Sequence, residues 1–137
     1  MGAFKVERTI HVPLEKVWAI AGDFTKSPDP SLPIAIVKKG DELNFGIGCE
    51  RHIKSGRAVI HERLEAVDPC HSYTYAMLSG APVKRYLAKV EFFAEGEGTH
   101  IKWSVDFIPK IPGTGGIIKS VIKKSYNKFI DEFEKIK

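Results

Sequence analysis

The residues best suited to chemistry are a glutamate and an arginine that interrupt apolar rows. Glu62 stands between Ile60 and Leu64, and Arg51 follows Cys49 by two positions. Alternate residues of a strand share one face, so both charges are expected on the same side as their apolar neighbours. A carboxylate and a guanidinium on an apolar surface can orient the polar end of a bound molecule. In an enzyme, the carboxylate can instead move a proton.

Three tyrosines place phenol groups on the same predicted face. Tyr73, Tyr75 and Met77 form the apolar row of the next strand, and Tyr86 begins the row of the strand after it. Two interpretations remain open. Either the charged pair and the phenols are the polar groups of a ligand pocket, or the pair is a buried ion pair that only fixes packing. A bulge in the strand would also be able to turn Glu62 outward.

The other motifs predict no metal or cofactor. Cys49 and His52 are three positions apart on a predicted strand, so their side chains point to opposite faces and cannot share one ion. Segment 113–120 has glycines before a Lys-Ser pair, but Ile118 occupies the position of the second phosphate-loop glycine. A turn into a helix with Thr114 as N-cap explains these glycines better.

The elements that must hold these groups follow from apolar periodicity. Alternation over Phe4–Val12 predicts a first strand, and Pro13 begins a helix of about three turns that ends near Phe24. Past residue 48, short turns separate alternating rows, a pattern typical of an antiparallel meander. Apolar residues then recur at helical spacing over about 22 residues from Gly115.

Turn residues set the predicted register of the meander. A two-residue loop at Ser55-Gly56 makes Arg51 and Glu62 diagonal neighbours, within reach of two long side chains. The loops at Ser55-Gly56, 68–71, 80–83 and Glu97-Gly98 predict four cross-strand pairs: Arg51 with Ile60, Leu64 with Tyr75, Met77 with Tyr86, and Phe92 with Trp103.

Together these elements predict an α+β fold, with a curved antiparallel sheet of about seven strands wrapped around a long C-terminal helix. A ligand cavity is expected between the apolar concave face and this helix. The residues expected to contact a ligand are Arg51, Ile60, Glu62, Tyr73, Tyr75, Met77, Tyr86, Ala88, Val90, Trp103, Val105, Ile118, Ile122 and Phe129.

Composition limits the class of protein. The 137 residues are 43% hydrophobic and 28% charged, which fits one globular domain over 1–137 and excludes a disordered tail protein.

The net charge is +4, and the basic C-terminal helix keeps Phe129 and Phe133 on its apolar stripe, so nucleic-acid binding is not expected. Two cysteines without CxxC spacing and the lack of a long apolar run predict a reduced, cytoplasmic protein without stable membrane insertion.

Several short segments carry a family resemblance that extends over essentially the whole chain. They are Val12-Pro13-Leu14-Glu15-Lys16-Val17-Trp18, Asp23-Phe24, Glu62-Arg63-Leu64-Glu65-Ala66-Val67-Asp68-Pro69, Tyr73-Thr74-Tyr75, Ser79-Gly80, Pro82-Val83 and Tyr86. With the order strand, helix, meander and long helix, the chain resembles the START-like, helix-grip (SRPBCC) superfamily. It looks most like the bacterial polyketide cyclase/dehydrase and lipid-transport family of that superfamily.

The resemblance implies a hydrophobic cavity that holds lipids, sterols, polyketides or plant hormones in different members. In the related abscisic acid receptors, a glutamate at the position of Glu62, a tyrosine at that of Tyr86 and an arginine near that of Arg51 line the ligand site. The receptors' Leu-Pro gate is missing here, because Ser55-Gly56 is followed by Arg57-Ala58. Glu62 would align with a catalytic glutamate of the related norcoclaurine synthase, but no lysine occupies the inward row of the following strand.

Three functional hypotheses follow. The first is a protein that binds a small hydrophobic ligand, for transport or sensing, with Arg51 and Glu62 orienting its polar end. The second is a cyclase- or dehydratase-type enzyme in which Glu62 is the acid or base and Tyr75 or Tyr86 assists. The third is a membrane-surface or chaperone-like module that uses the basic C-terminal helix. The sequence identifies no protein partner.

Overall fold

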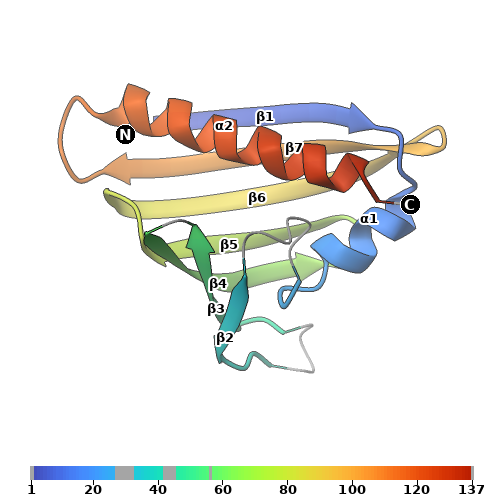
Figure 1. Cartoon of the computed structure of the whole chain (residues 1–137), viewed down its shortest axis with the longest axis horizontal. Helices are drawn as coiled ribbons and strands as arrows, with labels where there is room; N and C mark the ends of the chain where they lie inside the picture. The colour runs from blue at the N-terminus through green and yellow to red at the C-terminus, as the bar shows by residue number, and fades with distance from the viewer. Residues whose placement is uncertain (1, 27–32, 42–45, 56, 137) are drawn as a thin grey trace.

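The computed structural model describes residues 2–26, 33–41, 46–55 and 57–136. Within them, seven strands form one antiparallel sheet in the order β1-β7-β6-β5-β4-β3-β2, and α2 lies across the face of β1 and β7 (Figure 1). The elements are β1 Gly2–Ile10, α1 Leu14–Ala21, β2 Ile34–Lys38, β3 Glu50–Ser55, β4 Ala58–Asp68, β5 Ser72–Ser79, β6 Val83–Glu95, β7 Gly98–Pro109 and α2 Gly115–Glu134. The predicted α+β fold is confirmed.

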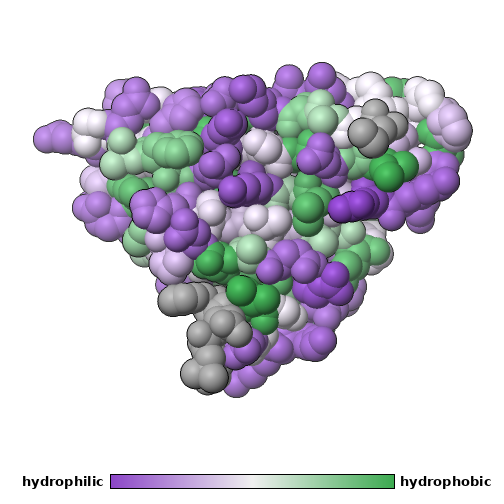
Figure 2. Space-filling view, turned by 180° about the vertical axis from the view of Figure 1, so that it is seen from behind, coloured by the Kyte–Doolittle hydropathy of each residue, from purple (hydrophilic) through white to green (hydrophobic). Residues whose placement is uncertain are grey.

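Alternating burial in β6 and β7 builds the core beneath α2. Along β7 every second residue is buried, and these residues are Thr99, Ile101, Trp103, Val105 and Phe107. Thr99 is buried despite its hydroxyl, because the hydroxyl donates a hydrogen bond to the Val12 carbonyl oxygen at 2.8 Å. The helix buries Ile118, Tyr126, Ile130 and Phe133 at helical spacing. On the opposite, convex face, hydrophilic residues are interspersed with exposed apolar ones (Figure 2).

Helix α1 is shorter than predicted. It ends at Ala21, whereas the apolar pattern predicted a helix that continues to near Phe24. Glycine is a poor helix former, and a Cβ at Gly22 would lie 2.4 Å from the ring of Trp18, which packs over this position. The Gly22 N–H donates to the Trp18 carbonyl at 2.8 Å and closes the last turn. The chain then turns and buries Phe24.

The predicted β3–β4 register is wrong by two residues. Ser55 pairs with Ala58, so Arg51 lies directly opposite Glu62 rather than diagonal to it. The two-residue loop therefore lies between Ser55 and Ala58, one position later than predicted. This shift moves every cross-strand partner by two residues. The turn residue Gly56 lies outside the described residues.

The β6–β7 register was also predicted wrongly, because Phe92 pairs with Ile101 rather than with Trp103. The turn uses Gly96, whose φ of +61° is in the left-handed region that favours glycine. Gly98 belongs to β7 and is small for another reason, since a Cβ there would lie 2.3 Å from the last carbonyl oxygen of β1. A glycine required for close packing was therefore interpreted as a turn residue.

The predicted β4–β5 pair of Leu64 with Tyr75 is confirmed, but the register shifts between His61 and Glu62 and again between Leu64 and Ala66. Asp68 consequently pairs with Ser72, so the loop between these strands is one residue shorter than predicted. Between β5 and β6, Tyr75 pairs with Ala88 and Ala76 with Leu87, which is the register predicted for these strands. The inward rows of β4, β5 and β6 are therefore aligned side by side on the concave face.

Candidate functional site

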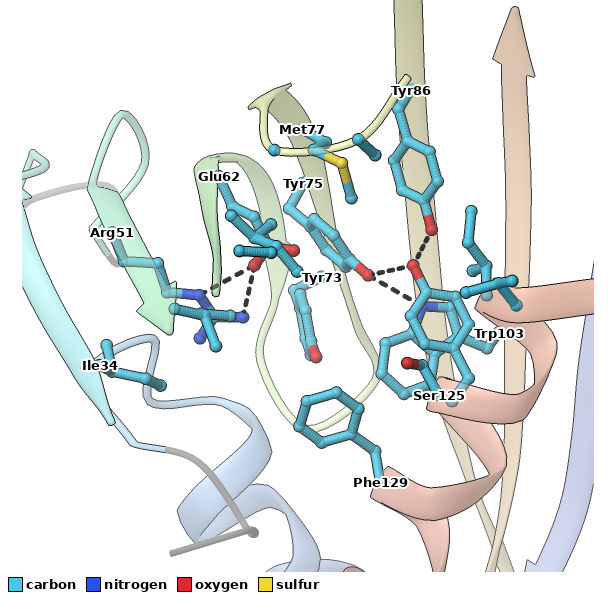
Figure 3. A pocket seen from close by; sticks show the side chains of 18 of the residues that line it. Ile34, Arg51, Glu62, Tyr73, Tyr75, Met77, Tyr86, Trp103, Ser125 and Phe129 are labelled. Carbon is cyan, nitrogen blue, oxygen red and sulfur yellow. Dashed lines mark hydrogen bonds and ion pairs between the residues drawn. The ribbon is translucent and has the colours of Figure 1, made fainter. Parts of the chain in front are cut away.

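A cavity of about 320 Å³ lies between the concave face of the sheet and α2. Side chains from β2 to β7, the β5–β6 loop and α2 line it, and Figure 3 shows polar groups entering from both the strands and the helix. A volume of this size is enough for a small organic molecule.

Ten of the fourteen predicted contact residues line this cavity. They are Arg51, Ile60, Glu62, Tyr73, Tyr75, Met77, Tyr86, Trp103, Ile122 and Phe129. The alternation of side chains along the strands, together with the helical spacing of apolar residues in α2, was sufficient to identify these ten residues.

The remaining four predicted residues do not line the cavity, and this is a correction to the sequence analysis. Ala88, Val90, Val105 and Ile118 are all buried in the hydrophobic core. Ala88 lies beside the larger Tyr75 on the neighbouring strand, and Val90 lies beside Trp103. Aromatic rings extend further from the sheet than these small side chains, so the rings form the wall. Parity identifies the face of a residue but not its depth.

Sequence reasoning missed several lining residues, of which Tyr126 is the most important chemically. It lies four positions after Ile122 and three before Phe129, so the helical spacing that selected those two residues also places Tyr126 beside them. Ile34 is different, because it comes from the edge strand β2, whose neighbours in the sheet no local pattern predicted.

Arg51 and Glu62 form a buried ion pair at one side of the cavity. Arg51 donates from Nε at 3.0 Å and from Nη2 at 2.9 Å, both to Oε1 of Glu62. Its Nη1 donates to the carbonyl oxygen of Phe24 at 3.0 Å, and the guanidinium lies 3.7 Å from the centre of the Phe24 ring. Only 11% of the Arg51 side chain and 7% of the Glu62 side chain are exposed. The turn after α1 thus holds the arginine in place.

Hydroxyl groups from two strands and the helix, with an indole N–H from a third strand, meet at the other side of the cavity (Figure 3). Tyr126 of α2 lies at the centre, with its hydroxyl 2.7 Å from that of Tyr75 and hydrogen-bonded to that of Tyr86. The Trp103 indole N–H donates to the Tyr75 hydroxyl at 3.2 Å, and its ring stacks on the Tyr126 ring with centroids 3.8 Å apart. We call Trp103, Tyr75, Tyr126 and Tyr86 the phenol cluster.

The cavity keeps its phenols uncharged. Burial raises the pKa of Tyr73 to about 12, with Arg51 lowering this pKa and Glu62 raising it. Burial is also the main reason that the pKa values of Tyr75 and Tyr86 are raised, and the negative charge of Glu62 adds to both effects. Near neutral pH these groups are therefore hydrogen-bonding hydroxyls rather than phenolates. The site offers one buried charged pair, the more exposed Lys26 and several neutral polar groups in a largely apolar enclosure.

Comparisons with known proteins identify related sequences and folds. A family model described as polyketide cyclase / dehydrase and lipid transport matches residues 1–136. No curated protein sequence matches the chain. Among solved structures, the protein XoxI from Bacillus cereus is 23% identical, with 98% of this chain and 94% of that chain covered and a TM-score of 0.79.

Two further solved structures share the fold at lower identity. A START superfamily protein from Mycobacterium smegmatis is 12% identical over 96% of this chain and 94% of that chain, with a TM-score of 0.78. Norcoclaurine synthase from Thalictrum flavum, in complex with dopamine and hydroxybenzaldehyde, is 16% identical over 98% of this chain and 84% of that chain, with a TM-score of 0.74. At these identities, the similarity shows a common fold but does not show a common reaction.

Proposed function

Because the chain belongs to the polyketide cyclase/dehydrase and lipid transport family and has the START-like helix-grip fold, we propose that it binds a small hydrophobic ligand in the cavity beneath α2. The observation that carries the proposal is an apolar cavity with its polar groups gathered at two separate positions, the Arg51–Glu62 pair and the phenol cluster. Apolar walls supply affinity, and a few fixed polar groups supply orientation.

Filling the cavity is expected to weaken ligand binding strongly without unfolding the protein. Ile60 lines the cavity from β4, so a tryptophan at this position occupies the volume that a ligand needs. We expect Ile60→Trp to weaken the binding of the neutral apolar dye Nile red by tenfold or more in a fluorescence titration. Circular dichroism spectra and thermal unfolding midpoints report whether the variant is folded.

The neighbouring residue provides a matched control. Val59 is 41% exposed and is not part of the cavity lining, and it is adjacent to Ile60 on the same strand. Strand alternation points its side chain to the other face, so Val59→Trp is expected to leave dye binding unchanged. If the two tryptophan variants bind the dye equally well, the cavity is not the binding site.

The cyclase or dehydratase alternative would use Glu62 as the proton carrier, with Tyr75 or Tyr86 assisting. In the structure, the hydroxyls of both tyrosines are hydrogen-bonded to Tyr126, and Arg51 donates two hydrogen bonds to one oxygen of Glu62. These contacts favour an anchoring role for the carboxylate. We therefore place ligand binding ahead of catalysis.

Both cysteines are free, which supports the cytoplasmic location that we propose.

The charge on α2 supports a second candidate function, reversible attachment to an anionic membrane surface. From Phe107 to Ile130 the sequence has five lysines and no acidic residue. Ile117 is 70% exposed and Val121 is 62% exposed, and Val121 also lines the cavity. At helical spacing, Lys124 continues the stripe that these two residues begin. Exposed apolar residues beside lysines suit the surface of a lipid bilayer. No helix in the described part of the chain is long and apolar enough to cross one.

Charge reversal on this stripe is expected to weaken membrane attachment. In sedimentation with phosphatidylcholine vesicles that contain phosphatidylglycerol, we expect Lys124→Glu to reduce the bound fraction at least fivefold, because each lysine near an anionic surface contributes about 1 kcal/mol. Lys89→Glu, on an exposed residue of β6, is the control and should bind like the unmodified protein. Added salt should release the protein. Absent or salt-independent binding would contradict the candidate function.

A further inference from the structure

The phenol cluster holds one more hydroxyl hydrogen than it can use. Tyr75, Tyr126 and Tyr86 supply three hydroxyl hydrogens, and the two contacts among these groups consume two of them. The third hydrogen has no acceptor among the residues that the structure describes. A phenol is already neutral at physiological pH, and burial raises the pKa of Tyr75 and Tyr86 further, so this surplus hydrogen is present there.

Trp103 sets the direction of the hydrogen bonds. An indole N–H is a donor only, so the Tyr75 oxygen accepts from Trp103. If Tyr75 then donates to Tyr126, and Tyr126 donates to Tyr86, each of the three oxygens accepts one hydrogen bond. The hydrogen bonds then all run in the same direction, from Trp103 towards Tyr86. Hydrogen bonds aligned in this way polarise and strengthen one another. In either other arrangement one oxygen would have to accept two hydrogen bonds: that of Tyr75 if the direction is reversed, or that of Tyr126 if both neighbours donate to it. The arrangement in which no oxygen accepts twice ends at Tyr86, whose O–H remains free to donate.

The other end of the cavity has the opposite character. The two hydrogen bonds that Arg51 donates to Glu62 both end on Oε1, and Oε2 has no hydrogen-bond partner among the described residues. Glu62 lines the cavity together with Tyr86, on the strand side of the space beneath α2 (Figure 3). The cavity thus offers an acceptor at the Glu62 carboxylate and a donor at the Tyr86 hydroxyl.

We infer that the cavity takes an uncharged, largely apolar hydroxy-ketone, with a carbonyl oxygen that accepts from Tyr86 and a hydroxyl that donates to Glu62. This inference rests on the proposed function and specifies its ligand class. Free carboxylic acids are a poor match, because a second carboxylate would lie beside that of Glu62. Three of the five N–H groups of Arg51 already bind Glu62 and the Phe24 carbonyl. The other cation in the lining, Lys26, is 57% exposed and lies 3.9 Å from Asp23.

A matched series of fluorescent naphthalenes tests this ligand class. The parent probe carries a hydroxyl and an acetyl group at opposite ends of the fused rings. One analogue has ethyl in place of acetyl, a second has methoxy in place of hydroxyl, and a third has carboxylate in place of acetyl. We expect loss of the carbonyl to weaken binding about fivefold, and loss of the hydroxyl about tenfold, because the second hydrogen bond involves a charged acceptor. The carboxylate should bind weakest.

The variant that assigns the donor is Tyr86→Phe. It should bind the acetyl and ethyl probes equally and keep its preference for hydroxyl over methoxy. Tyr126→Phe retains the Tyr86 hydroxyl, so it should keep part of the preference for acetyl. Equal binding of the acetyl and ethyl probes by the unmodified protein would overturn the inference, as would an unchanged acetyl preference in Tyr86→Phe. The first of these outcomes decides the question even if the variant fails to fold.

Binding of Nile red separates this inference from the function on which it rests. If the unmodified protein binds Nile red but shows no preference within the naphthalene series, the ligand class is wrong and the binding function stands. If neither Nile red nor any naphthalene binds, the proposed function fails and the inference fails with it.

Discussion

Replacing Arg51 with leucine is expected to lower the free energy of unfolding by about 3–5 kcal/mol. The substitution leaves the Glu62 carboxylate, with 7% of its side chain exposed, without the guanidinium that donates two hydrogen bonds to it. It also removes the hydrogen bond to the Phe24 carbonyl and the contact with the Phe24 ring. Urea denaturation followed by tryptophan fluorescence measures the loss.

Two further variants show whether the effect comes from an unpaired buried charge. In the double variant Arg51→Leu/Glu62→Leu both charges are absent, so most of the lost stability should return. Arg63→Leu breaks a surface ion pair with Glu65, in which 42% and 34% of the side chains are exposed, and should cost less than about 1 kcal/mol. If the Arg51 variant loses no more stability than the Arg63 variant, the buried pair is not a structural support.

A second large effect is expected at alkaline pH, where the protein should lose stability steeply as the pH rises from about 10 towards 12. The pKa of Tyr73 is 10.0 in an ordinary environment and about 12 in the folded protein. Below both values the hydroxyl is protonated in both states, and its contribution is constant. Between them the unfolded chain releases a proton that the folded chain retains, so rising pH favours unfolding.

The difference for Tyr73 alone corresponds to about 2–3 kcal/mol. The raised pKa values of Tyr75 and Tyr86 act in the same direction. Denaturation curves measured across this pH range give the slope, and the ultraviolet absorbance of phenolate reports ionisation directly. We expect the absorbance of these three groups to rise together with unfolding, and Tyr73→Phe to flatten the slope. Ionisation of these tyrosines near pH 10 in protein that is still folded would contradict the prediction.

Much of the fold could be predicted because its strands alternate strictly. In β7 the sequence around Trp103 repeats apolar and polar residues without interruption, and the buried face follows directly from that repeat. The same reasoning places Glu62 and Tyr75 on the concave face from the sequence alone. The charged pair was recognisable because each member breaks an otherwise apolar row.

The errors arose where one residue type can serve two different structural roles. Gly98 looked like a turn residue, but the structure shows a glycine that admits the backbone of β1. Gly22 ended α1 earlier than the apolar pattern indicated. The shape of the cavity could not be derived from strand parity, because parity does not distinguish Ala88 beneath its aromatic neighbours from Tyr86 at the wall. Depth depends on side-chain size in three dimensions.

The pairing of β1 with β7 has a consequence for the order in which the molecule is assembled. Gly2 pairs with Phe107, so β1 is synthesised about 100 residues before the strand with which it pairs. Until then Val6 and Ile10, which are buried in the finished protein, lack both the neighbouring strand β7 and helix α2, which packs on β1. Contacts between such distant segments carry a high entropic cost of loop closure and slow the folding of a domain. Strands β3 to β6 join consecutive neighbours and are able to pair while β1 waits.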